Sequence, residues 1–338
     1  MAMTIYDISK KAGVSIATVS RVLNGSENVR PSTRKKVMDV IDKYDYTPNA
    51  FARGMGLHSL KTIGILCADS SDLFLAKAVY FLEQELQANG YESLLCCTGY
   101  NLDIKKNYLN LILSKKVDSI ILVGSNFIGS TEDENQYIKD VSTQVPIMLL
   151  NASFDYPNVY STLCDDYGTM FEATAEMIQA GITDILYLYD SKSYSGLKKL
   201  HGFCDAMKEY NIPGFEKLIH FYDGNIEHLN EVADFVARIA TKGTSFHGIM
   251  TSDDSLAIGS IKYAQKKGIR IPEELSVMGY NNSMLTNCCT PELTSVDNRL
   301  ETLTHQLVQT LLGVLAGEEM PKKSIFSGKI IKRGTTLF

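Results

Sequence analysis

Residues 4–24, TIYDISKKAGVSIATVSRVLN, constrain the fold of the chain more than any other segment, because they encode two short helices joined by a tight turn. The first helix is expected over residues 5–12, with Thr4 as its cap. Gly13 suits a left-handed turn, and Ser15 suits the cap of a second helix that extends to the end of the segment. Two helices joined in this way are typical of the helix-turn-helix, whose second helix enters the major groove of DNA.

The second helix has one apolar face and one mixed face. Val19, Val22 and Leu23 follow helical spacing and are expected to point inward. The residues left facing outward are Ile16, Ala17, Ser20, Arg21 and Asn24. This outer face carries no acidic residue and combines hydrogen-bonding groups with small apolar ones, which suits contact with base edges.

A third helix is expected from Pro31 to Tyr44, with Val37, Ile41 and Tyr44 on its inner face. The sequence YTP then breaks the helical pattern. Residues 49–55, NAFARGM, can form a helix but are too short to hold one alone in water. This segment is therefore expected to become helical only when a partner supports it.

Charge is divided unevenly along the 338 residues. Residues 1–60 hold nine Lys and Arg against five Asp and Glu, a net of +4, whereas the rest holds twenty-four against thirty-four, a net of −10. Positive charge is thus concentrated in the segment expected to meet DNA. The seven cysteines are an odd number with no CxxC sequence and no zinc-site spacing, so reduced, non-catalytic thiols are expected.

From residue 61 onward, apolar runs typical of buried parallel strands alternate with amphipathic helices. A first set of strands is expected in KTIGILCAD, ESLLCCT, DSIILVGS and PIMLLN, and a second in DILYLYD, KLIHFYDG, GIMTSDD and ELSVMGYNN. The tail adds a strand, a long helix and a final strand. Two such sets predict two Rossmann-like lobes. The first strand is not followed by a Gly-rich dinucleotide loop, and no Walker A sequence occurs, so dehydrogenase and kinase functions lose their main support.

The string at residues 4–24, together with VRPSTRKKV and YTPNAFARGM, resembles the lactose-repressor/galactose-repressor (LacI-type) family. The resemblance implies an α/β protein with a small all-α helix-turn-helix head and a two-lobed, periplasmic-binding-protein type I (Rossmann-like) body. The domain limits it suggests are 1–46 for the head, 47–60 for a hinge helix and linker, and 61–338 for the body. Within the body, the N-lobe is expected at about 61–161 plus 293–322 and the C-lobe at about 162–292 plus 323–338.

The resemblance also assigns DNA contacts. Positions expected to touch phosphates or sugars are Thr4, Tyr6, Ser15, Thr18, Ser20, Asn24 and Thr33. Base-reading positions are Ile16, Ala17 and Arg21, since Arg21 can fork onto guanine and the other two can meet thymine methyl groups. The hinge-helix positions, with Met55 as the minor-groove wedge, are Asn49, Ala52, Arg53 and Met55. Arg30 replaces a smaller capping residue and is a further candidate for a phosphate contact.

In the body, the resemblance points to an effector cleft between the lobes. Its expected residues are Asp69, Ser71, Phe74, Asn151, Lys199, Asp254 and Asn281. Phe74 would stack on a sugar ring, and Lys199 stands where arginine is usual, so it offers a point charge in place of a fork. The sequence therefore predicts a polar, nearly neutral cleft with one lysine, suited to an uncharged sugar or a singly anionic ligand.

The function expected from these features is a homodimeric repressor of carbohydrate-utilisation genes, released from pseudo-palindromic double-stranded operator DNA by a small sugar-like effector. An alternative within the same class reverses the switch, with a corepressor or a phosphorylated carrier protein raising the affinity for DNA. A more remote alternative is a solute-binding protein, which the missing signal peptide and the hinge argue against. No catalytic residues, cofactor or metal are expected. The chain is expected to be cytoplasmic, with no membrane partner.

Overall fold

A computed structural model describes residues 3–23, 26, 28–46, 59–241 and 243–338. The chain divides into two compact units, one made of Met1–Thr62 with Lys116–Asp118 and the other of Ile63–Lys115 with Ser119–Phe338. The expected hinge-helix residues lie outside the described part of the chain, and so does one of the expected contact residues of the head. These are Asn49, Ala52, Arg53 and Met55 of the hinge, and Asn24 of the head.

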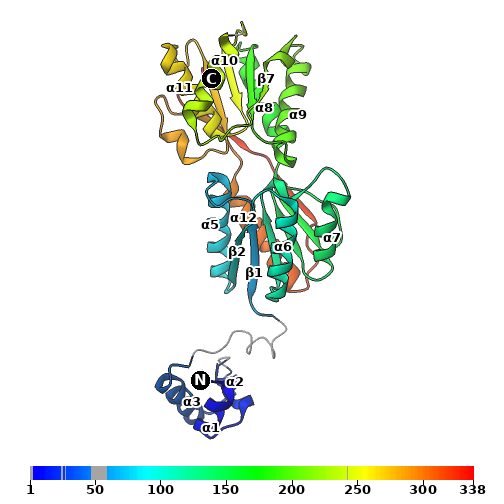
Figure 1. Ribbon diagram of the computed structural model, residues 1–338, viewed down its shortest axis with the longest axis vertical. Helices are drawn as coiled ribbons and strands as arrows, with labels where there is room; N and C mark the ends of the chain where they lie inside the picture. The colour runs from blue at the N-terminus through cyan, green and yellow to red at the C-terminus, as the bar shows by residue number, and fades with distance from the viewer. Residues whose placement is uncertain (1–2, 24–25, 27, 47–58, 242) are drawn as a thin grey trace. The chain divides into compact units, whose positions relative to one another are not determined.

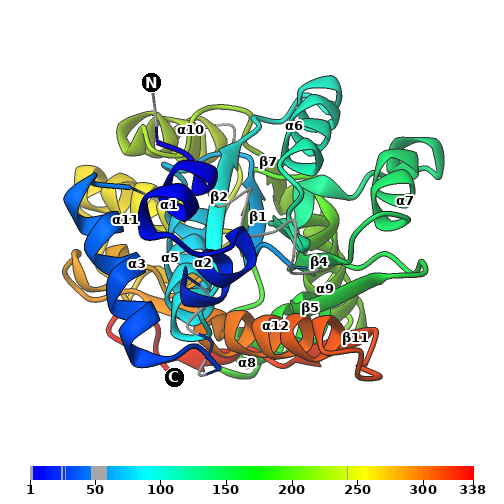
Figure 2. The same cartoon turned by 90° about the horizontal axis from the view of Figure 1, so that it is seen from below.

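Three helices form the head: α1 (Ile5–Ala12), α2 (Ile16–Leu23) and α3 (Pro31–Lys43). They pack around one small apolar core (Figures 1 and 2), which contains Ile8, Val19, Val22, Val29, Val37, Ile41 and Tyr46. The inner stripe predicted for the third helix is wrong at one position. Tyr44 is 39% exposed, with the Lys11 ammonium 4.4 Å from its ring centre, and Tyr46 fills the core instead. The helix ends at Lys43, so helical spacing no longer applies to Tyr44.

The first sheet of the body has the strand order β11-β5-β4-β3-β1-β2. Its strands are β1 (Thr62–Cys67), β2 (Glu92–Cys97), β3 (Ser119–Val123), β4 (Ile147–Leu150), β5 (Val159–Cys164) and β11 (Lys323–Phe326). Helices α5 (Leu73–Ala88) and α12 (Leu300–Leu315) share one core with alternate residues of β1, such as Ile63 and Ile65. On the opposite face, Gly64 of β1 lies against Ile112 of α6 (Leu102–Ser114). The helix α7 (Gln136–Ser142) follows on that side (Figure 2).

The second sheet has the order β12-β10-β9-β8-β6-β7. Its strands are β6 (Ile185–Tyr189), β7 (Ile219–Phe221), β8 (Gly248–Thr251), β9 (Ser276–Tyr280), β10 (Thr294–Asp297) and β12 (Lys329–Ile331). β12 runs antiparallel to β10, and the other pairs are parallel. Helices α8 (Asp166–Gln179) and α9 (Tyr194–Glu209) cover one face, and α10 (Leu229–Thr241) and α11 (Asp254–Lys267) cover the other (Figure 1).

The chain passes between the two lobes three times, and the strands place these crossings a few residues from the expected limits. β5 stays in the first sheet as far as Cys164, and β11 at 323–326 also belongs there. β10 at 294–297 belongs to the second sheet. Strands β5 and β11 were not among the expected strands. Both are polar at several positions, VYSTLC and KSIF, so neither reads as a buried apolar run.

A close helix contact in the second lobe depends on one glycine. A Cβ atom at Gly202 of α9 would lie 2.3 Å from the carbonyl oxygen of Tyr167 in α8. This oxygen belongs to the backbone of a helix, so it cannot move aside as the end of a flexible side chain can. We therefore expect Gly202→Ala to lower the free energy of unfolding by about 2 kcal/mol through overpacking. Chemical denaturation would measure the loss. The exposed neighbour His201 on the same helix provides the control, and an equal loss in His201→Ala would contradict the explanation.

Candidate functional site

The outer face of α2 is exposed as the sequence predicted. Ile16 is 40% exposed, and Ala17 and Arg21 are also exposed, whereas Val19 and Val22 are buried in the head core. The helix has no acidic residue in its first turn, and Arg21 lies in its last turn. α2 thus presents two apolar side chains and one guanidinium to a partner, the combination that can contact thymine methyl groups and the guanine edge.

Hydroxyl groups hold the starts of the two leading helices. Thr4 and Asp7 form a reciprocal capping box, in which the Thr4 amide donates to Asp7 Oδ2 at 2.9 Å. The Thr18 amide donates to Ser15 Oγ at 3.2 Å, and the two hydroxyls of that pair lie 2.9 Å apart. Thr4 and Ser15 therefore orient the helices, whatever further contact they make.

The remaining predicted head residues differ in exposure. Tyr6 is 69% exposed, and Ser20 and Thr33 are half-buried. Arg30 stands at the cap position of α3 without a side-chain capping bond and is exposed. No residue in the described ranges binds its guanidinium.

Between the two lobes lies a cavity of about 150 Å³. The first lobe contributes Asp72, Phe74, Leu75, Tyr100, Gly124, Ser125, Asn126 and Asn151. The second contributes Asp190, Ser191, Ser193, Ser195, Gly196, Lys199, Ile226, Ser252, Asp253 and Asn281. Four residues predicted for an effector cleft are thus brought together, namely Phe74, Asn151, Lys199 and Asn281. Ser125 donates to Ser193 at 2.8 Å, a hydrogen bond that joins the two walls.

Three carboxylates line this cavity, and each is oriented by a hydrogen bond. Asp72 caps α5 by accepting from the Leu75 amide, Asp190 accepts from the Ser252 hydroxyl at 2.8 Å, and Asp253 accepts from the Asn281 side-chain amide at 2.8 Å. Burial raises the pKa of Asp72 to about 6, and the charge of Asp253 adds to that rise. Burial, with Asp253 next, also raises the pKa of Asp190. The three negative groups therefore act on one another within a small space.

Lys199 reaches the cavity from α9 and is 7% exposed. Its ammonium donates to the Ser252 carbonyl at 3.0 Å and lies 3.9 Å from the centre of the Tyr280 ring. Behind it is Asp166, which accepts from Ser195 and, at 2.7 Å, from the Tyr280 hydroxyl. Burial raises the pKa of Asp166, and the nearby charge of Lys199 opposes that rise more than any other group. Lys199 therefore lies close enough to Asp166 for its positive charge to favour the ionised form of that buried carboxyl group.

Two asparagines follow the ends of strands at the cavity. Asn151, after β4, has a φ of +61° and is 7% exposed, and nothing in the described part of the chain hydrogen-bonds its Oδ1 atom. Asn281, after β9, donates to Asp253 and accepts from Asn298 at 3.0 Å. A buried amide oxygen without a partner costs free energy. The Asn151 oxygen is therefore positioned to accept a hydrogen bond from a ligand.

Three residues predicted for the effector cleft do not line the smaller cavity. Asp69 lines an adjoining cavity of about 600 Å³ and accepts from both the amide and the hydroxyl of Ser71, which is exposed outside both cavities. Asp254 is 0% exposed and lines neither cavity, and its carboxylate accepts from the Ser283 amide and the Ser295 hydroxyl, each at 2.6 Å. Its neighbour Asp253 lines the pocket instead.

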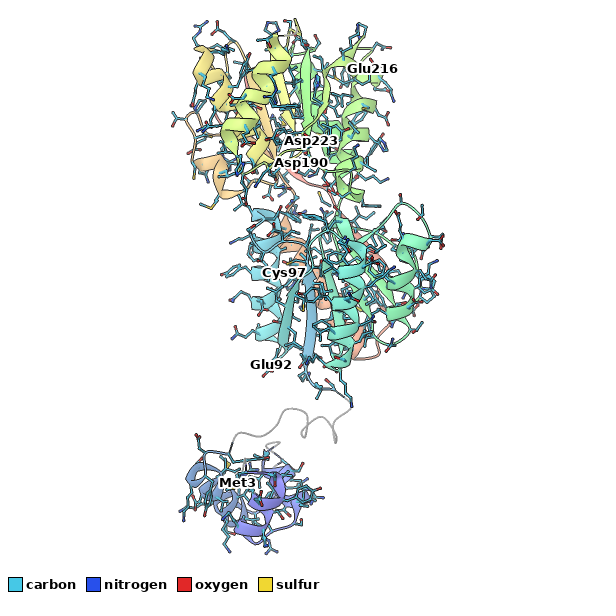
Figure 3. The ribbon with its side chains drawn as sticks, viewed as in Figure 1. Met3, Glu92, Cys97, Asp190, Glu216 and Asp223 are labelled. Carbon is cyan, nitrogen blue, oxygen red and sulfur yellow. The ribbon has the colours of Figure 1, made fainter. Side chains whose placement is uncertain are left out.

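The cleft is acidic, and the expectation of a nearly neutral one is wrong. Asp72, Asp190 and Asp253 face a single Lys199 among the described residues that line the smaller cavity, and Asp223 and Glu227 line the larger one. Asp190 and Asp223 both lie on the side of the second lobe nearest the first (Figure 3). The effector residues predicted from sequence include none of these groups, although Asp190 directly follows the strand-like run ILYLY, a position where open α/β sheets bind ligands.

The described residues include no group of three or more His, Cys, Asp or Glu side chains placed to hold a metal ion. Asp165 and Asp253 cap α8 and α11, and Asp166 and Asp254 are buried behind them. No helix in the described ranges is long and apolar enough to cross a bilayer.

Comparison with known protein families gives a match in each of the two units. Residues 4–49 match the family model of bacterial regulatory proteins of the lacI family, and residues 174–336 match a periplasmic binding protein-like domain. An HTH-type transcriptional regulator of Lachnoclostridium phytofermentans is 49% identical over 99% of this chain and 100% of its own length. Catabolite control protein A of Priestia megaterium is 33% identical over 88% of this chain and 87% of its own.

Solved structures agree on the fold. The lac repressor dimer bound to operator and the anti-inducer ONPF aligns over 100% of both chains, with a TM-score of 0.87 and 21% identity. The transcriptional regulator CelR in complex with cellobiose aligns over 98% of this chain and 99% of its own, with a TM-score of 0.71 and 21% identity. At these identities the likeness shows the shared architecture of a helix-turn-helix head and a two-lobed body.

Proposed function

The chain belongs to the lacI family of bacterial regulatory proteins and is a DNA-binding transcriptional regulator, and we propose that it is a homodimeric repressor of carbohydrate-utilisation genes. Two heads bind the half-sites of a pseudo-palindromic operator, and an uncharged sugar bound between the lobes releases them. We also infer that it regulates without catalysing a reaction, since its full-length relative is a transcriptional regulator. Its site of action is then the cytoplasm, with the chromosome.

The observation that carries the DNA-binding role is the outer face of α2. Its exposed side chains Ile16, Ala17 and Arg21 stand on a helix whose other face is fixed in the head core. A rigid helix with a guanidinium and two apolar groups facing out matches the chemistry of the major-groove edge. The helix also lacks an acidic residue that would repel phosphates.

We expect Arg21→Ala to weaken specific operator binding by about 1–3 kcal/mol per subunit and to relax the preference at one base pair of each half-site. The reason is the loss of a bidentate contact to guanine. A gel-shift assay on an operator selected from random palindromes would measure both effects. Lys43→Ala removes the same charge from the end of α3 and should weaken all sequences alike. An equal loss on all sequences for Arg21→Ala would place Arg21 among the phosphate contacts.

The acidic cavity supports an uncharged, hydroxyl-rich effector over an anionic one. Asp72, Asp190 and Asp253 can accept hydrogen bonds from sugar hydroxyls, and Asn151 offers a further acceptor. A phosphate or carboxylate would meet these three carboxyl groups in a partly desolvated space. The single ammonium of Lys199 cannot offset this repulsion alone, because it faces three carboxyl groups in the cavity and also lies near the buried Asp166.

A thermal-shift screen of neutral sugars against the matching sugar phosphates tests this preference. A neutral sugar at a hundred times its Kd should add about 2.7 kcal/mol of stability, whereas its phosphate should add little. Stronger stabilisation by a sugar phosphate would contradict the proposal for the pocket while leaving the operator assay untouched.

The same sugar and operator can be used to test whether the effector lowers or raises the affinity for DNA. We propose induction, in which the sugar lowers operator affinity because it binds the DNA-free arrangement more tightly. The relative named catabolite control protein A keeps the reverse direction as the second candidate. A gel shift that strengthens on addition of the stabilising sugar would favour corepression.

A further inference from the structure

Two thiols lie at the ends of neighbouring strands in the first lobe. Cys67 is the last residue of β1 and is fully buried, and Cys97 is the last residue of β2 and is exposed. Their sulfur atoms are 3.8 Å apart, and both cysteines are free. β2 is the edge strand of its sheet, and Figure 3 marks Cys97 on it. The Cys97 sulfur is therefore accessible to reagents in the solvent, whereas the neighbouring Cys67 sulfur is buried.

We propose that Cys67 and Cys97 are a peroxide-responsive thiol pair that closes to an intramolecular disulfide. Adjacent strands lie about 4.8 Å apart, which falls within the range of Cα separations that a disulfide spans. The sulfur atoms need to approach by a little under 2 Å to reach bonding distance, a movement that side-chain rotation at the strand ends can supply. In a reducing compartment such a bond is transient, as redox-sensing disulfides are.

The two cysteines take different parts in the reaction. The Cys97 thiolate attacks hydrogen peroxide, breaking the O–O bond, so that Cys97 becomes a sulfenic acid and hydroxide leaves. Cys67 sulfur then attacks Cys97 sulfur, the S–S bond forms and the S–O bond breaks. The departing hydroxide takes the Cys67 proton as water, so two thiols and one peroxide give one disulfide and two waters. Burial, and then the neighbouring Cys97, raise the pKa of Cys67 to about 12, so Cys67 stays protonated and the first step, the attack on peroxide, belongs to the exposed Cys97.

The bond would act on the wall of the pocket. Beyond the cysteines, the segments that follow β1 and β2 stay hydrogen-bonded to each other. The Thr98 amide donates to the Cys67 carbonyl at 2.9 Å, and the Gly99 amide donates to the Ala68 carbonyl at 2.8 Å. The loops that begin there carry Asp72 and Tyr100, which line both cavities. A covalent tie at this point restricts the opening of both loops.

The experiment treats the reduced full-length protein with hydrogen peroxide, blocks remaining thiols and maps peptides without reduction. The expected product is one Cys67–Cys97 bond per chain, with the loss of two hydrogen masses. Cys97→Ser should abolish it. Cys96→Ser on the same strand and Cys288→Ser, an exposed thiol in the other lobe, should leave it intact.

A second variant separates the two steps. In Cys67→Ala the sulfenic acid at Cys97 should persist and be trapped by dimedone, whereas the parent protein should give little adduct. A bond between Cys97 residues of two copies, a Cys96–Cys97 bond, or Cys67 left reduced after oxidation of Cys97 would overturn the pairing. Amide hydrogen exchange over residues 68–73 and 98–101 should slow in the oxidised protein, and unchanged exchange would overturn the tie to the pocket.

Discussion

Asp254→Ala is expected to lower the free energy of unfolding by about 3 kcal/mol, because it leaves one buried and one half-buried donor without an acceptor. The carboxyl group is 0% exposed, and it accepts from the Ser283 amide and the Ser295 hydroxyl. Gly279 of β9 lies directly against it, since a Cβ there would come within 2.2 Å of Asp254 Oδ1. Urea unfolding followed by circular dichroism would measure the loss.

The adjacent residue provides a matched control. Asp253 is a partly exposed cap that accepts from the Ser255 amide at the start of α11. Asp253→Ala removes this cap and should cost only about 1 kcal/mol. Equal losses in the two variants would contradict the assignment of Asp254 to the interior, and a sugar response lost only with Asp254 would return it to the pocket.

Asp254 also predicts a pH dependence. Burial, and next the charge of Asp253, raise the pKa of Asp254 to about 7, above its ordinary value of 3.8. Because the pKa of Asp254 is higher in the folded than in the unfolded state, protonation of Asp254 stabilises the folded protein. This contribution to the free energy of unfolding is complete below about pH 4 and is lost as the pH rises through about 7. The difference between those limits is about 4 kcal/mol. Asp254→Asn should make the fall in stability across this window shallower, with Asp72, Asp166 and Asp190 supplying the slope that remains, whereas the exposed-carboxylate variant Asp223→Asn should keep the slope of the parent protein.

The head could be predicted from sequence because its signals are local. Thr4, Gly13 and Ser15 are read from neighbouring residues, and the structure places them at the expected caps and turn. The apolar runs likewise predicted most strands of both sheets. The polar strand β5 was missed because its burial depends on strands β4 and β11 on either side, which no local pattern records.

Only some of the residues that line the pocket could be predicted from sequence, because the others depend on side-chain direction and on the packing of the two lobes. Position after a strand, together with the family resemblance, identified Phe74, Asn151, Lys199 and Asn281. The choice between Asp253 and Asp254 depends on which way each side chain leaves the first turn of α11, and adjacent residues leave it about 100° apart. The acidic character of the cleft depends on carboxylates from both lobes, and sequence alone does not bring these into one space.

Lys199→Met is expected to abolish the sugar response and to lower the free energy of unfolding by about 3 kcal/mol. Methionine keeps the unbranched shape of the side chain, one heavy atom shorter, but removes the positive charge near Asp166, which is buried and accepts hydrogen bonds from Ser195 and Tyr280. Operator binding should persist at temperatures where the variant is folded, since the head carries its own core. Gel shifts with and without the stabilising sugar, and urea unfolding, would measure the two effects.

A double variant separates the structural from the binding role of Lys199. Asp166→Asn removes the buried charge that Lys199→Met leaves uncompensated, so the pair together should recover most of the lost stability. The sugar response should stay absent, because the cavity still lacks its ammonium group. A double variant that recovers both stability and response would show that Lys199 serves only to neutralise Asp166. A single variant that responds like the parent protein would remove Lys199 from the effector site.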